Sequence, residues 1–260
     1  MTSPLILPSH DRATEFAWTA AIARARAVYG FNSLDARSRS FNLLRGRLVR
    51  LRNERNWRSI GIVSATPNVG KSFVSANLAA AMSRDPRLDT MLIDLDLRRG
   101  TLKEIFGIQT EGGIRSYLED EVAHLELAAF RPAGEKLLIV PNLPGDIRSA
   151  EALASQRMGN FMGAIRTSPP SKFYLFDLPP VYANDDAATI IEQLDGYIFI
   201  AEEGKSTQQE VQSAIELLGQ ERLAGVVLNK YQGGLLSEGT GVENRYASNY
   251  YAEKSNAGED

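Results

Sequence analysis

SATPNVGKSFVSANLA, residues 64–79, is the stretch that decides the fold. It follows the apolar run 60–63 and precedes a helix-like pattern, so it predicts a strand, a loop and the start of a helix. Backbone N–H groups in such a loop and at such a helix N-terminus point at phosphate oxygens. Gly70 gives the turn, Lys71 adds a positive charge, and Ser72 offers a hydroxyl to Mg²⁺. The stretch therefore predicts a phosphate-binding loop.

The loop departs from the common pattern G-x-x-x-x-G-K-[ST] at its first position, where Ala65 stands. Asn68 tolerates the left-handed backbone that glycine usually supplies in such a loop. We expect Asn68, Val69 and Phe73 to surround the nucleotide together with the Gly-Lys-Ser core. A glycine-rich turn that only joins a strand to a helix is the alternative interpretation.

Two further apolar strands, predicted over 90–94 and 173–177, close on acidic side chains. Asp94 and Asp96 are two residues apart, so they can project to one side and reach one Mg²⁺. Asp177 can hold a water bound to that ion. Ligands of parallel sheets bind at the carboxyl ends of the strands, where these acids fall. The alternative is that the acids merely end their strands in solvent.

The pattern of apolar residues predicts an α/β fold of the P-loop NTPase type, a mainly parallel sheet with helices on both faces. Helices are predicted over 14–29, 38–53, 102–106, 114–118, 149–165 and 206–218, and strands over 60–63, 90–94, 136–140, 173–177, 197–201 and 225–228.

Composition sets limits on function. The 260 residues are 43% hydrophobic and 23% charged, with a net charge of -3 and no cysteine. These values are ordinary for a globular protein, exclude disulfides and thiolate metal sites, and give no reason to expect nucleic acid as a partner. With no secretory signal and no apolar run of about 18 residues, we expect a cytoplasmic protein that neither spans a membrane nor is exported by that route.

Three parts are predicted along the chain: an N-terminal tail and helices over 1–55, a nucleotide-binding core over 56–230, and a flexible tail over 231–260. Residues 1–11 carry prolines without periodicity and are expected to be flexible. The helix predicted over 38–53 is rich in arginine. It is interpreted as a core-docked helix with a solvated basic face, with lipid, a partner protein or nucleic acid left as alternatives.

These segments resemble the bacterial tyrosine kinases (BY-kinases) of capsule and exopolysaccharide synthesis, within the deviant Walker A ATPases. The loop is similar to their Walker A motif, and MLIDLDLRRGTLKEIFGI, residues 91–108, is similar to their Walker A prime segment. Blocks at 113–121, 141–158 and 173–187 follow in the family's order. The tail resembles the family's tyrosine cluster.

The resemblance implies a protein-tyrosine autokinase that uses ATP and Mg²⁺ and regulates polysaccharide polymerisation and export. It assigns Lys71 to the β and γ phosphates, with Asp94 and Asp96 at the reacting centre. Ser72, Asp94 and Asp177 would serve the metal, and Asn229 the adenine. The implied phosphate acceptors are Tyr246, Tyr250 and Tyr251.

The implied partners are a separate inner-membrane co-polymerase that activates the kinase and holds it at the membrane, a second copy of the chain, and a tyrosine phosphatase. The family's Glu-x-x-Arg-x-x-Arg ring motif falls on Arg39, Asn42 and Arg45, so either no ring forms or it uses other contacts. Two other hypotheses stay open: a nucleotide-binding scaffold without phosphotransfer, and a positioning ATPase. Thr66 stands where a positioning ATPase has its signature lysine.

Overall fold

The structure is a computed structural model. The residues that it describes are 5–122, 124–145 and 149–231. Those up to Asn229 belong to one compact unit, and the next two belong to a second unit. The predicted acceptor tyrosines, Tyr246, Tyr250 and Tyr251, lie outside the described residues. The predicted division of the chain into three parts stays a prediction.

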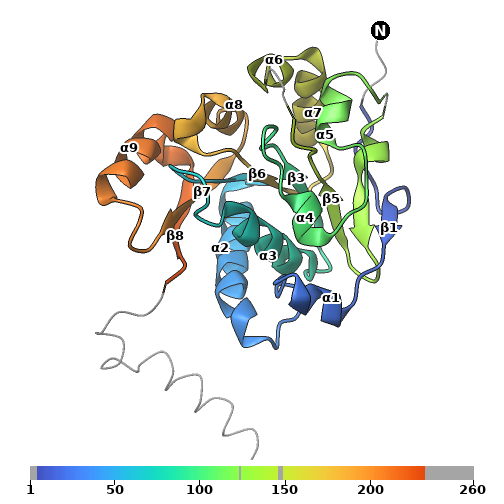
Figure 1. Cartoon of the computed structure of the whole chain (residues 1–260), viewed down its shortest axis with the longest axis horizontal. Coiled ribbons are helices and arrows are strands. Elements are labelled where there is room, and N and C mark those ends of the chain that lie inside the picture. Colours follow the sequence, from blue (N-terminus) through green and yellow to red (C-terminus); the bar gives the residue numbers. More distant parts are fainter. Residues whose placement is uncertain (1–4, 123, 146–148, 232–260) are drawn as a thin grey trace, which may run out of the picture. The chain divides into compact units, whose positions relative to one another are not determined.

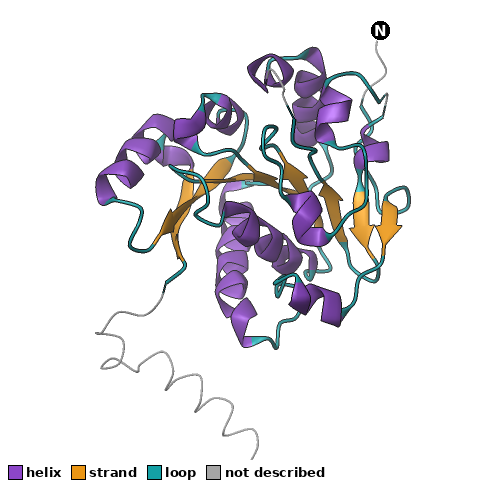
Figure 2. Cartoon of the chain, viewed as in Figure 1, coloured by secondary structure: helices purple, strands orange, loops and turns teal. Residues whose placement is uncertain are grey.

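The described residues form an eight-stranded sheet in the order β1-β4-β5-β3-β6-β2-β7-β8 (Figures 1 and 2). Only β4 and β5 pair in antiparallel fashion; the other neighbours are parallel. The predicted mainly parallel sheet is therefore confirmed. The strands are β1 (Thr14–Phe16), β2 (Ser59–Val63), β3 (Asp89–Asp94), β4 (Phe130–Pro132), β5 (Leu137–Val140), β6 (Lys172–Asp177), β7 (Gly196–Glu202) and β8 (Leu223–Asn229).

Helices cover both faces of the sheet because both faces are apolar. In β3, Met91 and Ile93 join one buried cluster and Leu92 joins the other, as expected for alternating side chains. One face carries α1 (Ala20–Ala25), α2 (Arg39–Arg55), α3 (Lys71–Ser83) and α4 (Leu102–Phe106). The other carries α5 (Ile114–Leu118), α6 (Ser149–Leu153), α7 (Gln156–Thr167), α8 (Asp186–Ile191) and α9 (Gln208–Leu218). No helix in the described ranges is both long and apolar enough to cross a bilayer.

The N-terminal segment differs from its prediction. The single helix predicted over 14–29 is wrong, because β1 pairs with β4 and only the short α1 is helical. Thr19 ends the extended stretch by accepting a hydrogen bond from the N–H of Ile22 at 3.2 Å. The flexible tail predicted over 1–11 is wrong for the described residues 5–11, where Leu5 and Leu7 pack against the core.

Of two other predicted helices, one is divided and one is confirmed. The helix predicted over 149–165 is α6 and α7, because Ser155 between them accepts from the N–H of Met158 at 3.1 Å and starts a new helix. The helix predicted over 38–53 is confirmed as α2, with Phe41 and Leu48 buried.

The arginines of α2 hold the helix on the core. Arg47 donates to the carbonyl oxygen of Ala224, and Arg52 donates to that of Pro170 at 2.7 Å. Arg45 reaches the carbonyl oxygen of Ala81 at 3.5 Å. These contacts favour the docked-helix interpretation over a surface for lipid or nucleic acid.

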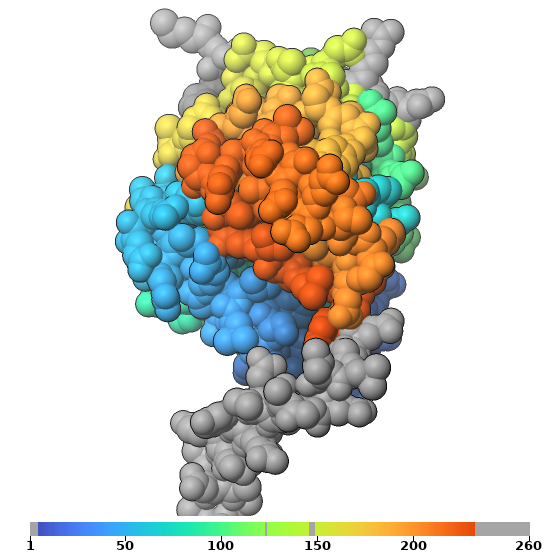
Figure 3. Space-filling view, turned by 90° about the vertical axis from the view of Figure 1, so that its left-hand side faces the viewer, coloured from blue at the N-terminus to red at the C-terminus, as the bar shows by residue number. Residues whose placement is uncertain are grey.

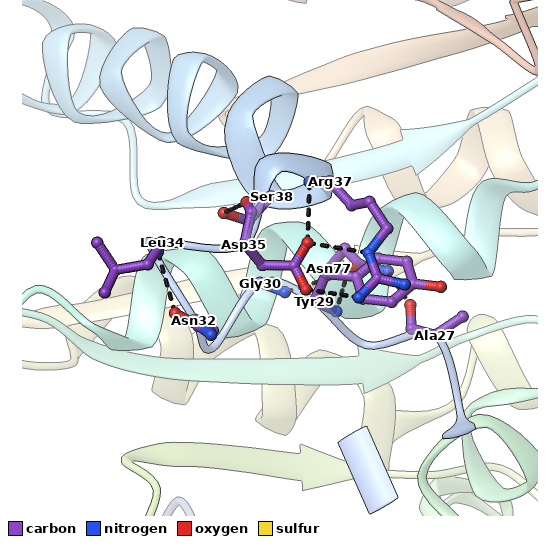
Figure 4. Close-up of polar contacts among 9 residues, drawn as sticks. All are labelled: Ala27, Tyr29, Gly30, Asn32, Leu34, Asp35, Arg37, Ser38 and Asn77. Atoms are coloured by element: carbon purple, nitrogen blue, oxygen red, sulfur yellow. Dashed lines mark hydrogen bonds and ion pairs between the residues drawn. The ribbon is translucent and has the colours of Figure 1, made fainter. Parts of the chain in front are cut away.

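Asn77 of α3 joins the N-terminal segment to the helix that follows the phosphate loop (Figure 4). Its Oδ1 accepts from the N–H groups of Tyr29 at 2.7 Å and Gly30 at 3.2 Å. Its Nδ2 donates to the carbonyl oxygens of Ala27 and Phe73, each at 3.0 Å. The side chain is fully buried, so these bonds satisfy groups that water cannot reach.

Strand β8 lies at the edge of the sheet, and Figure 3 shows it between the blue of α2 and the orange of α9. It contains no charged residue. Val226 and Leu228 are about half exposed, at 49% and 53%. An edge strand with this composition has few of the features that usually block pairing with another chain.

We predict that Asn77→Ala lowers the free energy of unfolding by about 3 kcal/mol, because it leaves buried N–H and C=O groups without partners. Urea unfolding with an unchanged m-value measures the loss. Asn53→Ala on the exposed face of α2 is the matched control, with an expected change within about 0.5 kcal/mol. Equal effects of the two changes would contradict the assigned role of Asn77.

Candidate active site

The phosphate loop joins β2 to α3 and contains two left-handed residues, Asn68 at φ 64° and Gly70 at φ 92°. The left-handed conformation expected for Asn68 is thus confirmed. Gly70 precedes the first residue of α3 and has no side chain to cap it. The first N–H groups of α3 therefore stay available to an anion, which the helix dipole also favours.

A cavity of about 460 Å³ opens beside this loop at the carboxyl ends of the strands. It brings together six of the predicted site residues: Asn68, Gly70, Lys71, Ser72, Phe73 and Asp96. The rest of its lining is Pro67, Arg98, Arg99, Thr101, Pro179, Pro180, Ala183 and Asn184. The described members of the predicted site that do not line it are Val69, Asp94, Asp177 and Asn229.

Lys71 and Asp96 face this cavity with opposite charges. Lys71 is only 7% exposed, so its ammonium group is largely removed from water. Burial raises the pKa of Asp96, while the positive charge of Lys71 and the backbone N–H of Arg99 act in the opposite direction. The Arg99 N–H lies 3.2 Å from Asp96 Oδ1 and fixes the carboxylate. A desolvated cation and an accessible carboxylate are thus placed within one cavity.

Asp94 and Asp177 form a buried pair behind this cavity, as register partners on β3 and β6. Asp94 is fully buried and accepts from the N–H groups of Asp96 at 3.2 Å and Leu102 at 3.1 Å. Burial, followed by the charge of Asp177, raises the pKa of Asp94 well above its usual range. The carboxylate of Asp94 therefore also holds the segment that carries Asp96.

Asp177 is held by hydroxyl groups of α3. Ser75 Oγ donates to Asp177 Oδ1 at 2.9 Å. Burial raises the pKa of Asp177 to about 6, while Lys71 and hydrogen bonds from Ser72 and Ser75 act in the opposite direction. Ser75 was not among the predicted site residues, although its place one turn after Lys71 puts it on the same helix face.

The residues present fit a Mg²⁺ ion that is bound together with phosphate. Two buried carboxyl groups and the Ser72 hydroxyl supply oxygen ligands, and the carboxylates, when ionised, supply negative charge that Lys71 offsets only in part. Across the described ranges, no three acidic, histidine or cysteine side chains converge on one point. Phosphate oxygens and water would therefore complete the shell, as is usual for Mg²⁺ in nucleotide sites.

The far wall of the cavity comes from the segment after β6. The N–H of Val181 donates to the carbonyl oxygen of Ser64 at 2.8 Å, and the N–H of Tyr182 to that of Ala65 at 3.1 Å. These bonds fasten the segment to the start of the phosphate loop. Asn184 and Thr101 line the cavity but were not predicted as site residues. They lie within the family-like segments 173–187 and 91–108, but their residue type and spacing did not distinguish them there.

Asn229, at the end of β8, lies behind the loop. Its Nδ2 donates to the carbonyl oxygen of Val69 at 2.8 Å. The predicted contact of Asn229 with adenine stays a prediction.

The fold and the cavity define a P-loop nucleotide-binding protein. A sequence profile of the CobQ/CobB/MinD/ParA nucleotide binding domain matches residues 60–251. The chain is 29% identical over 178 residues to the tyrosine-protein kinase YwqD of Bacillus subtilis, covering 68% of this chain and 73% of that protein. The kinase domain of the Escherichia coli tyrosine kinase ETK has the same fold, with a TM-score of 0.68 and 23% identity over 80% of this chain and 82% of that one.

The chain belongs to the CobQ/CobB/MinD/ParA nucleotide-binding family. Its similarity within that family is to proteins named tyrosine-protein kinases. Its relatives differ in length. The tyrosine-protein kinase wzc of Salmonella typhimurium is 28% identical over 170 residues, which are 65% of this chain but only 23% of that relative.

We predict that Asp177→Asn stabilises the nucleotide-free protein by about 2 kcal/mol near pH 8 and has little effect near pH 4. The folded pKa of about 6 lies above the usual 3.8. The contribution of protonated Asp177 to the free energy of unfolding is therefore complete below about pH 3.8 and is lost as the pH rises through about 6. Asparagine cannot ionise and avoids this loss.

Urea unfolding at both pH values measures the effect, with the exposed Asp11→Asn as the matched control. An effect of the same size at both pH values, or a variant that is less stable near pH 8, would contradict the assigned burial cost of Asp177.

Proposed function

We propose that the chain is an ATP-dependent protein-tyrosine autokinase that regulates polymerisation and export of an exopolysaccharide or capsule. The observation that carries the proposal is one cavity that joins a phosphate loop, Lys71, Ser72 and the carboxylate of Asp96. Relatives named tyrosine-protein kinases support it.

In the proposed reaction, loop N–H groups and Lys71 bind the phosphates of ATP and hold the γ-phosphorus in line with a tyrosine hydroxyl. The bond between the γ-phosphorus and the β–γ bridging oxygen breaks, its electrons leave with ADP, and a bond to the tyrosine oxygen forms. Mg²⁺ supplies neutralisation of the phosphate charge. Lys71 adds to this from a site largely screened from water, where its charge acts strongly.

Asp96 is proposed to accept the proton of the tyrosine hydroxyl, because it is the acid that lines the cavity and its pKa is raised by burial. Asp94 and Asp177 are proposed to serve the metal with Ser72. Each oxygen of Asp94 that accepts one backbone N–H keeps a second lone pair for a ligand.

We further propose that Tyr246, Tyr250 and Tyr251 are the phosphate acceptors, that an inner-membrane co-polymerase activates the chain and holds it at the cytoplasmic membrane face, and that a tyrosine phosphatase reverses the reaction. Self-association, if it forms a ring, would use contacts other than the expected motif. Asn42 accepts from Arg84, and Arg45 reaches a carbonyl of its own chain.

We predict that the chain expressed with Lys71 intact carries phosphate on its C-terminal peptide and that Lys71→Met reduces this at least about a hundredfold, the loss expected when charge stabilisation of a transition state is removed. Mass spectrometry of that peptide measures both. Lys205→Met is the matched control, because Lys205 is half exposed and pairs only weakly with Glu202 at 3.5 Å.

Phosphotyrosine that is equal with and without Lys71 would refute the proposed reaction. Its absence from every variant, even with MgATP and the activating partner's cytoplasmic segment, would favour the nucleotide-binding scaffold.

We predict that the combined change of Tyr246, Tyr250 and Tyr251 to Phe removes nearly all phosphate from the chain, while the fold and ATP binding stay unchanged. Tyr231→Phe is the control within the same tail and should leave labelling near the wild-type amount. Labelling that survives the triple change would place the main acceptors elsewhere.

A further inference from the structure

We infer that Asn229 is a positioning residue that holds the phosphate loop in its anion-binding shape. The inference deepens, and rests on, the nucleotide site of the proposed function. It goes beyond contact with adenine, because it assigns Asn229 a role toward the phosphates, which it does not itself touch.

Asn229 stands in a defined place. It is the last residue of β8, and its carbonyl oxygen accepts from the N–H of Glu203 at 3.1 Å, beside the end of β7. Its half-buried side chain then reaches across to the loop, where Nδ2 donates to the carbonyl oxygen of Val69 at 2.8 Å. A carbonyl oxygen can only accept, so the nitrogen side of the amide must face the loop.

This bond fixes the direction of the next N–H group. In a planar trans peptide the C=O of one residue and the N–H of the next point in opposite directions. Because the Val69 carbonyl faces Asn229, the N–H of Gly70 points away from Asn229. Gly70 itself lines the nucleotide cavity. Asn229 thus sets the orientation of the peptide that leads into α3.

The contact also explains why residue 70 is glycine. A Cβ at Gly70 would lie 2.2 Å from Asn229 Nδ2, so the Asn229 side chain would have to move away from the loop, and the φ of 92° is strained for other residues. Asn229 therefore contacts the loop in two ways: its amide donates to the Val69 carbonyl oxygen and lies close to the Gly70 Cα.

The hypothesis that Asn229 positions the loop and the hypothesis that it contacts only the adenine base predict different binding results. If Asn229 positions the loop, a ligand with phosphates and no base depends on it. If Asn229 only contacts adenine, such a ligand does not. Inorganic tripolyphosphate with Mg²⁺, which has phosphates and no base, is therefore the probe.

We expect Asn229→Asp and Asn229→Ala to weaken binding of magnesium tripolyphosphate to the full chain about tenfold, the effect of losing one hydrogen bond to a buried carbonyl. Calorimetry measures it. The melting temperature of the ligand-free chain should fall by only about 2–4 °C, the shift that corresponds to about 1 kcal/mol. The chain then stays folded during the binding measurement, which separates positioning from a general loss of stability. Asn53→Asp, an exposed change of the same kind on α2, should bind like the wild type.

A double-mutant cycle gives the second readout. Gly70→Ala should weaken tripolyphosphate binding by a smaller factor in the Asn229→Ala background than in the wild type, because the clash is then relieved. Unchanged tripolyphosphate binding in both Asn229 variants, additive effects in the cycle, or no binding to the wild type would each overturn the inference. Tripolyphosphate binding without any phosphotyrosine would refute the proposed kinase and leave the inference standing.

Discussion

The main electrostatic constraint on the structure is a pair of carboxyl groups whose burial costs free energy of folding. Asp94 and Asp177 lie side by side on β3 and β6 with almost no exposure to water. Their mutual repulsion and desolvation oppose folding unless a cation or proton compensates them. Lys71, two serine hydroxyls and two backbone N–H groups offset part of this cost. A buried acidic pair that lowers the stability of the ligand-free protein is expected at a functional site, where the bound ligand compensates the charge.

The phosphate loop is held from several elements rather than by its own sequence. The segment after β6 donates to the carbonyls of Ser64 and Ala65, and the last residue of β8 donates to that of Val69. Asn77 joins α3, the helix that follows the phosphate loop, to the N-terminal segment by hydrogen bonds. A loop that contains two left-handed residues needs this support, because its shape is not the preferred one for the isolated chain.

Local patterns predicted the central strands, α3 and the loop, because each of these elements is encoded by neighbouring residues. They did not predict β1 or β4, which are three-residue strands. β1 pairs with β4, more than a hundred residues away, and β4 pairs with β5 at only one register position. At the site, the period-two rule placed Asp94 and Asp96 on one side. The strand ends at Asp94, however, so Asp96 turns to the cavity while Asp94 stays behind it. Contacts such as that of Asn229 with Val69 join residues 160 positions apart and have no local signal.

The uncharged outer strand has a consequence for the behaviour of the protein in solution. β8 is the edge strand of the sheet formed by the described residues, it contains no charged residue, and Val226 and Leu228 are half exposed, a composition that does little to prevent two molecules from pairing edge to edge. Concentrated samples would then lose material to precipitation while their circular dichroism stays native. A lysine at an outward position of this strand would be the natural remedy for storage.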